Sequence, residues 1–163
     1  ILVTHDRDEA FRIAQEIATV DRGQLTPPMD RHELFRSPGT CAGARLTGCK
    51  NISAARRRDA AHIEATDWGI TLTVTDNVTD AHHIAIRAHY FVPVQEDGEN
   101  VFPAQIAEII ESTFSMIVML RFAAGAHLVR WEVDKPAWEA LHVSENASLR
   151  ICFPPDALML LRD

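Results

Sequence analysis

The feature that most constrains the fold is a series of short segments, beginning at residue 70, in which apolar and polar side chains alternate. Alternation with a period of two places every second side chain on the same face, so each segment predicts a half-buried strand. Turn-forming residues such as 67–69 and 97–100 separate the segments, and Pro136–His142 is the one helical interruption. The predicted strands are 70–74, 84–87, 106–110, 116–122, 128–133, 149–153 and 158–161. Many short strands at regular spacing predict a mainly β sandwich or barrel. No strong internal repeat is evident.

The first 50 residues have a different pattern, which predicts a short α/β segment. Residues 1–4 form an apolar run typical of a strand, and Asp6 with Glu9 predicts the start of a helix through residue 17. Residues 19–25 then predict a hairpin around a glycine turn. Two short helices, at 30–35 and 41–46, follow a Pro-Pro break. We therefore place the domain boundary after residue 50.

Composition excludes several classes of protein. The net charge of -7 argues against a nucleic-acid partner, which needs a basic face, and the run Arg56-Arg57-Arg58 is more typical of a solvated loop. The three cysteines contain no C-x-x-C pair, which fits a reduced cytoplasmic compartment better than a disulfide framework or a zinc site. No apolar run is long enough to cross a bilayer, and no signal-peptide pattern is present.

One histidine occupies a position where α/β proteins place ligand-contacting groups. His5 directly follows the first predicted strand and precedes the predicted helix start at Asp6. Its imidazole can donate a hydrogen bond to a phosphate oxygen. Judged on position alone, an ordinary loop histidine is the commoner outcome.

The wider pattern around His5 resembles a known family. Thr4-His5-Asp6 with Glu9-Ala10 and Asp21-Arg22-Gly23 resembles the switch-loop segment of ABC-transporter ATP-binding subunits. The segments 33–38, 44–48 and 51–52 resemble the connection from the ATPase domain to a regulatory domain in sulfate, molybdate, polyamine and sugar importers. The resemblance implies that residues 1–50 are the C-terminal remnant of the ATPase domain with its linker. It also implies that His5 contacts the γ-phosphate of ATP in the intact subunit.

The rest of the machinery for ATP hydrolysis is missing from the sequence. It contains no G-x-x-x-x-G-K-[ST] loop, no acidic strand end to hold magnesium and no family signature motif. We therefore expect these residues not to act as an enzyme by themselves and to hold no cofactor, with ATP and Mg²⁺ belonging to the full-length subunit. The first predicted strand lacks sheet partners, so we expect residues 1–25 to be displaced, swapped onto a neighbour or poorly ordered.

Residues 51–163 resemble the accessory β-barrel of the same subunits, a TOBE/MOP-like domain of the oligonucleotide-binding (OB) type. The resemblance is carried by 85–88, 100–102, 143–150 and 152–158. It implies a regulatory domain that forms a homodimer, in a cytoplasmic subunit bound to membrane permease subunits at the inner face of the cell membrane. The cargo class that we favour is molybdate or sulfate, followed by polyamine or iron.

A free-standing module that binds an oxyanion inside the cell is the alternative. In molybdate-binding modules an early segment, matched here by Asn100, Val101 and Phe102, and a late lysine-containing turn supply donors to the anion. The late turn here, 153–156, lacks the lysine and loses two backbone donors to proline. Acidic residues also precede Asn100, so an anion would bind against local repulsion.

Two further clusters have simpler explanations. Asp80, His82, His83 and His89 could suggest a metal site, but adjacent strand residues point to opposite faces, so we predict no metal there. A nucleobase platform is the alternative role for four late aromatic residues. Core packing or a subunit interface is the favoured role of Phe122, Trp131, Trp138 and Phe153.

Overall fold

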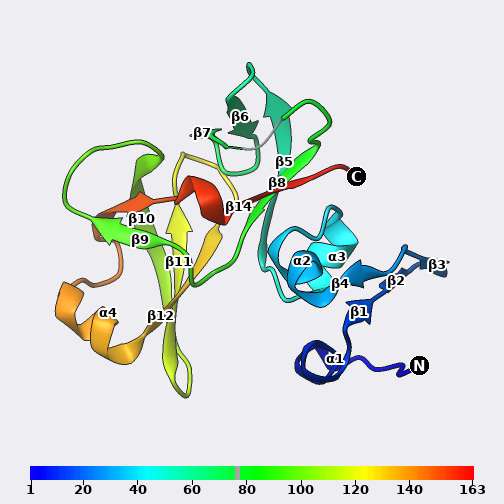
Figure 1. Ribbon diagram of the computed structural model, residues 1–163. Helices are drawn as coiled ribbons and strands as arrows, with labels where there is room; N and C mark the ends of the chain where they lie inside the picture. The colour runs from blue at the N-terminus through cyan, green and yellow to red at the C-terminus, as the bar shows by residue number, and fades with distance from the viewer. Residues whose placement is uncertain (76–77) are drawn as a thin grey trace.

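The computed structural model describes residues 1–75 and 78–163 and consists of an N-terminal arm and a β-rich body (Figure 1). The arm carries short helices and two-stranded ribbons, in which β1 pairs with β4 and β2 pairs with β3. Within the described residues, no helix is both long enough and apolar enough to cross a membrane. The elements of the arm are α1 (Arg7–Ile13), β1 (Glu16–Ile17), β2 (Val20–Asp21), β3 (Gln24–Leu25), β4 (Met29–Asp30), α2 (Arg31–Arg36) and α3 (Cys41–Leu46).

The body consists of two five-stranded antiparallel sheets. The first sheet has the order β14-β8-β5-β6-β7, and the second has the order β9-β13-β10-β11-β12. A helix, α4 (Lys135–Leu141), connects β12 to β13, and a single 3₁₀ turn, η1 (Pro155–Ala157), precedes β14. The strands are β5 (Asn51–Arg57), β6 (His62–Ala65), β7 (Ile70–Thr73), β8 (His83–Ile86), β9 (Val92–Val94), β10 (Val101–Glu111), β11 (Ser115–Arg121), β12 (Val129–Asp134), β13 (Ser148–Cys152) and β14 (Leu158–Leu161).

The two sheets repeat the same strand order and exchange their fifth strands. Strands β5 to β8 are arranged as β10 to β13 are, each set in the order fourth, first, second, third. The chain then leaves β8 to form β9, which pairs with β13 of the second sheet, and it leaves β13 to form β14, which pairs with β8 of the first. The expectation of no internal repeat is therefore wrong at the level of topology. Each half supplies the strand that completes the other.

One large apolar core fills the body, and aromatic rings form its centre. The ring of Phe153 is fully buried, with ring centroids of Phe91 at 4.9 Å and Phe122 at 5.0 Å. Trp131 is only 2% exposed and packs edge-on against Trp138 at 6.1 Å. Because these rings pack against one another, they form part of the apolar core, with Phe122 and Trp138 partly buried at its margin.

Two buried asparagines fasten the two halves together at equivalent points. Asn51, the first residue of β5, accepts a hydrogen bond from the backbone N–H of Arg130 in β12 at 2.8 Å and donates to the carbonyl of Arg130 at 2.8 Å. Asn100, directly before β10, makes the same pair of bonds with the backbone of Thr73 in β7, both at 2.7 Å. Strands β7 and β12 hold the same place in their sheets. The hydrogen bonds of Asn51 and of Asn100 are therefore equivalent in the two halves, and we call each pair of bonds a clasp.

The arm departs from the sequence-based expectations at its start. Residues 1–4 form no strand, and the side chains of Ile1 and Val3 are exposed. The predicted helix through residue 17 ends at Ile13 instead. The reason is the guanidinium of Arg31, which donates to the carbonyls of Phe11 at 3.0 Å and Ala14 at 3.3 Å and so satisfies the end of α1.

Replacement of Asn100 by alanine should lower the free energy of unfolding by about 3 kcal/mol, measured by urea denaturation. About 2 kcal/mol of this comes from the unpaired backbone groups of Thr73, and about 1 kcal/mol from the left-handed backbone at φ 53°, which alanine tolerates less well. The matched control is Asn146→Ala, at an exposed residue with φ 65°, which should cost about 1 kcal/mol. Equal losses of unfolding free energy in the two variants would contradict a stabilising role for the hydrogen bonds between Asn100 and Thr73.

Candidate functional site

The predicted switch histidine lies on the surface of the arm, at the start of α1. His5 is exposed and precedes Asp6, whose Oδ1 accepts hydrogen bonds from the N–H groups of Glu9 at 3.0 Å and Asp8 at 2.9 Å. These two donors hold the pKa of Asp6 below its usual value. The predicted helix start is thus confirmed at Asp6, although its own N–H pairs with Thr4 Oγ1 at 3.0 Å and not with Glu9. The phosphate-contacting role of His5 stays a prediction.

An open apolar groove of about 970 Å³ runs beside His5. It is bounded by residues 1–20 on one side and by the ends of α2 and α3 on the other. Several large apolar side chains of the arm are left in solvent, namely Ile1, Val3, Ile13, Val20 and Leu25. These five residues all line the groove, and exposed apolar side chains gathered around a groove are typical of a surface that a partner covers.

The side chain of an arginine in the body contacts both short helices of the arm. Arg87, which follows β8, donates to the carbonyl of Thr47 at 2.7 Å and to the carbonyl of Phe35 at 2.5 Å. Its guanidinium also lies over the ring of Phe35, at 5.9 Å from the centroid. These carbonyls belong to the C-terminal ends of α3 and α2, where the helix dipole favours a cation. Arg87 therefore fixes the orientation of α2 and α3 against the body.

The residues predicted to bind an oxyanion are engaged inside the barrel. The side-chain amide of Asn100 is hydrogen bonded to the backbone of Thr73, and Val101 pairs with Cys152 in the β10–β13 ladder. Phe102 packs its ring against Phe153 at 5.8 Å. The assignment of Asn100, Val101 and Phe102 stays a prediction, but an anion there would have to displace the Asn100 clasp.

A second hollow, of about 500 Å³, lies between the edge strands β9 and β12 and beneath α4. Its apolar floor includes Phe91 and Trp131, and its polar groups include Glu132 and Asp134. No lysine or arginine is among the described residues that line it. An oxyanion would meet carboxylates in this hollow and no permanent positive charge.

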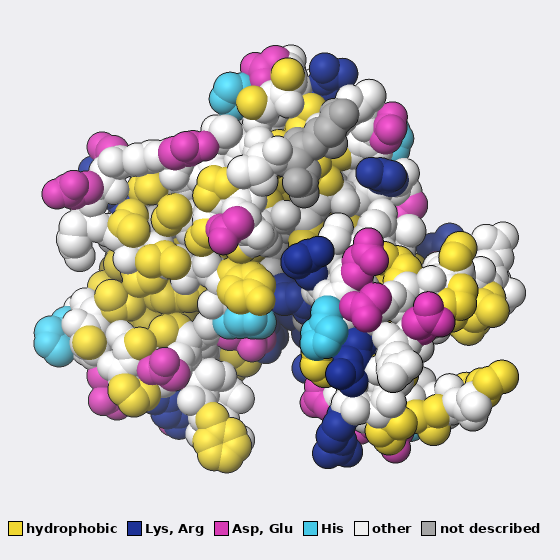
Figure 2. All heavy atoms as spheres, in the orientation of Figure 1, with side chains coloured by type: hydrophobic (Ala, Val, Ile, Leu, Met, Phe, Trp, Pro, Cys, Tyr) yellow, Lys and Arg dark blue, Asp and Glu magenta, His cyan; other side chains and the backbone are white. Residues whose placement is uncertain are grey.

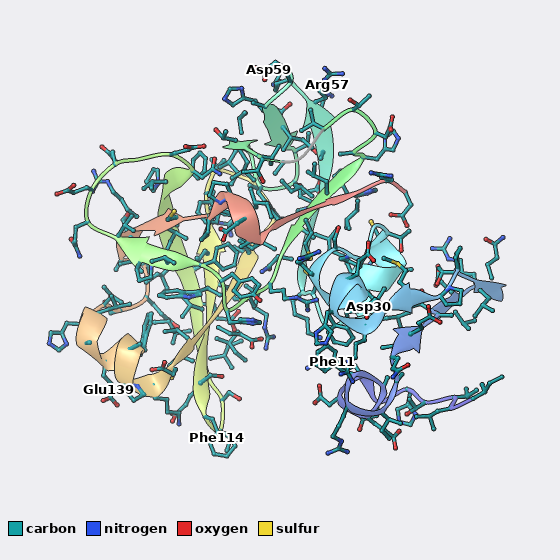
Figure 3. All side chains as sticks on the ribbon, viewed as in Figure 1. Phe11, Asp30, Arg57, Asp59, Phe114 and Glu139 are labelled. Atoms are coloured by element: carbon teal, nitrogen blue, oxygen red, sulfur yellow. The ribbon has the colours of Figure 1, made fainter. Side chains whose placement is uncertain are left out.

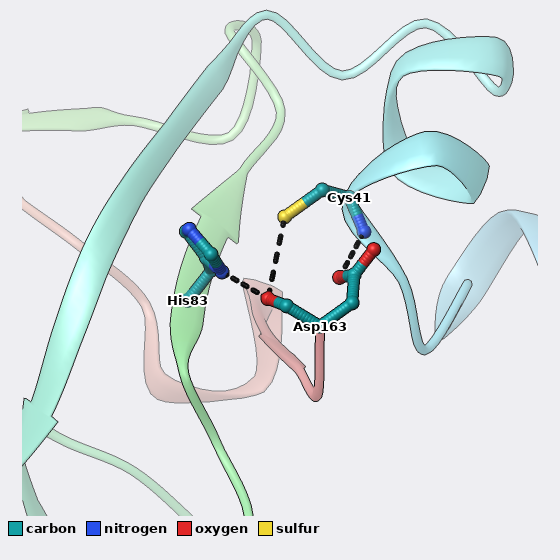
Figure 4. A group of neighbouring side chains, drawn as sticks. All are labelled: Cys41, His83 and Asp163. Atoms are coloured by element: carbon teal, nitrogen blue, oxygen red, sulfur yellow. Dashed lines mark hydrogen bonds between the residues drawn. The ribbon is translucent and has the colours of Figure 1, made fainter. Parts of the chain in front are cut away.

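Three side chains from distant parts of the chain meet where the arm contacts the body (Figure 4). The ligating atoms of Cys41, His83 and Asp163 all lie within 4.8 Å of one another. Burial, reinforced by Asp163, raises the pKa of the Cys41 thiol to about 11. This is the group of metal-ligating side chains found among residues 1–75 and 78–163, and it shares only His83 with the predicted set of Asp80, His82, His83 and His89. Sequence reasoning missed it because the residues are widely separated along the chain.

Comparison with curated proteins finds relatives over most of the chain, although the chain matches no protein-family model. The spermidine/putrescine import ATP-binding protein PotA of Rubrobacter xylanophilus is 28% identical over 158 residues, which cover 91% of this chain and 42% of the relative. The molybdate/tungstate import ATP-binding protein WtpC of Pyrococcus abyssi is 24% identical over 96% of this chain and 45% of the relative. The homologues of this chain are ATP-binding subunits of ABC importers. The chain spans less than half the length of these two relatives.

A solved structure supports the fold of the body. The cytoplasmic molybdate-binding protein ModG, solved with molybdate bound, superposes with a TM-score of 0.56 at 14% identity. The match covers 71% of this chain and 98% of ModG. The protein is mostly β with curled antiparallel sheets, consistent with the predicted OB-type β domain.

Replacement of Arg87 by lysine should loosen α2 and α3 from the body. Lysine keeps the charge but cannot hold two carbonyls with a planar fork, so we expect a loss of about 2 kcal/mol in unfolding free energy. Hydrogen exchange should rise selectively in α2 and α3. Arg121→Lys is the control, because Arg121 donates one bond of 3.3 Å to Ala126 within the body. Unchanged exchange in the Arg87 variant would contradict the assigned role.

Proposed function

We propose that this chain is the regulatory and dimerisation part of the ATP-binding subunit of an ABC importer. The observation that carries the proposal is the extent of the similarity, which runs through both the arm and the body and covers 91% and 96% of the chain in two relatives. The intact subunit would energise solute uptake together with membrane permease subunits, on the cytoplasmic side of the membrane. Oxyanions and polyamines are both represented among the solutes that the relatives' names give.

The arm supplies a route by which nucleotide binding would reach the barrel. In the intact subunit His5 would contact the γ-phosphate of ATP at the start of α1. Further along α1, the ring of Phe11 lies 4.8 Å from the ring of Phe35, and the guanidinium of Arg87 in the body lies over the ring of Phe35 at 5.9 Å from its centroid. This series of contacts supports coupling between the two parts. The residues present lack a phosphate-cradling loop, so hydrolysis would need the remainder of the ATPase domain.

The surface of the body supports a homodimer. Strand β9 is an edge strand of the second sheet, and Val92 within it and Tyr90 shortly before it are 46% and 45% exposed. Phe114, at the tip of the β10–β11 hairpin, is 86% exposed and points away from the body (Figure 3). Figure 2 shows apolar side chains gathered on the face that the body presents in this view. Apolar surface next to a free sheet edge is typical of an interface.

Multi-angle light scattering should show a dimer that the substitution Val92→Glu converts to monomer, because the new charge would be buried at the β9 edge. Leu25→Ser removes an exposed apolar side chain from the arm, 68% exposed against 46% for Val92, and should leave the dimer intact. A monomeric wild-type protein at high concentration would remove the dimerisation role. It would leave the family assignment untouched.

An oxyanion-binding module is the second candidate, and the fold shared with ModG favours it. Two observations argue against it. The side-chain amide of Asn100 is already hydrogen bonded to Thr73, and the described lining of the hollow beneath α4 contains no lysine or arginine. Titration calorimetry with molybdate, tungstate and sulfate separates the two functions, with chloride as the control. We expect no saturable heat from any of the three. Saturable binding of molybdate that Asn100→Ala abolishes would establish the alternative.

A further inference from the structure

Three different metal-ligating side chains converge on the surface between arm and body. Cys41 is the first residue of α3, His83 is the first residue of β8, and Asp163 follows the end of β14. Figure 4 shows the sulfur of Cys41 and the ring of His83 both directed toward Asp163. A thiol, an imidazole and a carboxylate brought together from three elements are a mixed set of donors that suits a transition metal.

The backbone holds these three residues on a well-connected scaffold. The Oδ1 atom of Asp163 accepts a hydrogen bond from the backbone N–H of Cys41 at 2.6 Å, and Nδ1 of His83 contacts the backbone carbonyl of Asp163. The ladder between β14 and β8 pairs Leu161 with His83, and Arg162 donates its backbone N–H to the carbonyl of Gly39 at 3.0 Å. Ligands carried on paired strands and a helix start keep their spacing better than ligands on free loops.

The spacing lies within side-chain reach of tetrahedral coordination. Zinc binds sulfur at about 2.3 Å and nitrogen or oxygen at about 2.0–2.2 Å, which places ligand atoms about 3.5 Å apart. The ligand atoms lie within 4.8 Å of one another, so each separation needs to shorten by at most about 1.3 Å. We propose that Cys41, His83 and Asp163 bind a zinc-type divalent ion, with the fourth position taken by water or by another ligand.

The charges of the proposed site balance. Binding breaks the S–H bond of Cys41 and releases one proton to solvent, and the resulting thiolate and the Asp163 carboxylate together neutralise the divalent ion. A neutral assembly suits this position, because Cys41 is only 7% exposed. Magnesium and calcium are excluded as occupants, since both prefer sites built from oxygen ligands. The bound ion ties α3 of the arm to β8 and to the end of β14, at a point separate from Arg87.

Cobalt(II) titration of the metal-free protein tests the site, because a cobalt–thiolate bond gives a charge-transfer absorption that zinc then displaces. We expect one cobalt ion per chain with this band. His83→Gln and Asp163→Asn change more accessible ligands and should weaken binding by about a hundredfold or more, since even outer-shell partners of a metal account for about 10- to 100-fold. Cys41→Ser should remove the band, and zinc should raise the thermal unfolding midpoint of the wild type but not of these variants.

Matched controls distinguish this site from adventitious binding. His82→Gln changes the neighbouring histidine, which is outside the group, and Cys152→Ser removes a half-buried thiol of the body. Both variants should keep the cobalt band and the zinc-dependent stabilisation. The proposal is overturned if the wild type gives no thiolate band, if the band survives in Cys41→Ser, or if His82→Gln weakens binding as much as His83→Gln.

Discussion

The exchange of fifth strands between the two sheets is the constraint on which the rest of the body depends. Strand β9 follows the first half in the chain but is hydrogen bonded to β13 of the second half. Strand β14 follows the second half and is hydrogen bonded to β8 of the first. Neither half can therefore be removed without taking an edge from the other. The side chains of Asn51 and Asn100 reinforce this at two equivalent points, since each both accepts a hydrogen bond from and donates one to the backbone of the opposite half. The body is accordingly one folding unit built from two copies of the same four-stranded arrangement.

The position of the arm follows from this construction. The crossing from β8 to β9 begins at Arg87, whose guanidinium binds the carbonyl ends of α2 and α3. A helix shorter than two turns contributes little stability alone, so the orientation of α2 and α3 is set by this contact and by the small cluster of Cys41, Ala44 and Met159. Any movement of the arm that nucleotide chemistry imposed would have to strain these same contacts.

Periodicity and motif resemblance were informative where local sequence controls structure, and they failed where distant pairing does. The alternating segments predicted most strands of the second sheet, and Asp6 predicted the start of α1. Strand β5 was missed because its small and charged residues have weak strand preference and are held by β8. Strand β9 was missed because Pro93 is tolerated only at a sheet edge, which sequence alone does not reveal. The role of Asn100 was missed likewise, because its hydrogen-bonding partner, the backbone of Thr73, lies far away in the sequence.

Strand exchange also sets the order in which this protein can be completed during its synthesis. The first sheet has four of its strands once residue 86 has been made, but β8 keeps a bare edge until residues 158–161 emerge. A ribosome adds about 5–20 residues each second, so that edge stays open for several seconds in every nascent chain. An uncovered edge invites pairing with a neighbouring chain. Crowding of nascent chains on one messenger would thus favour intertwined products in which β14 completes the wrong copy.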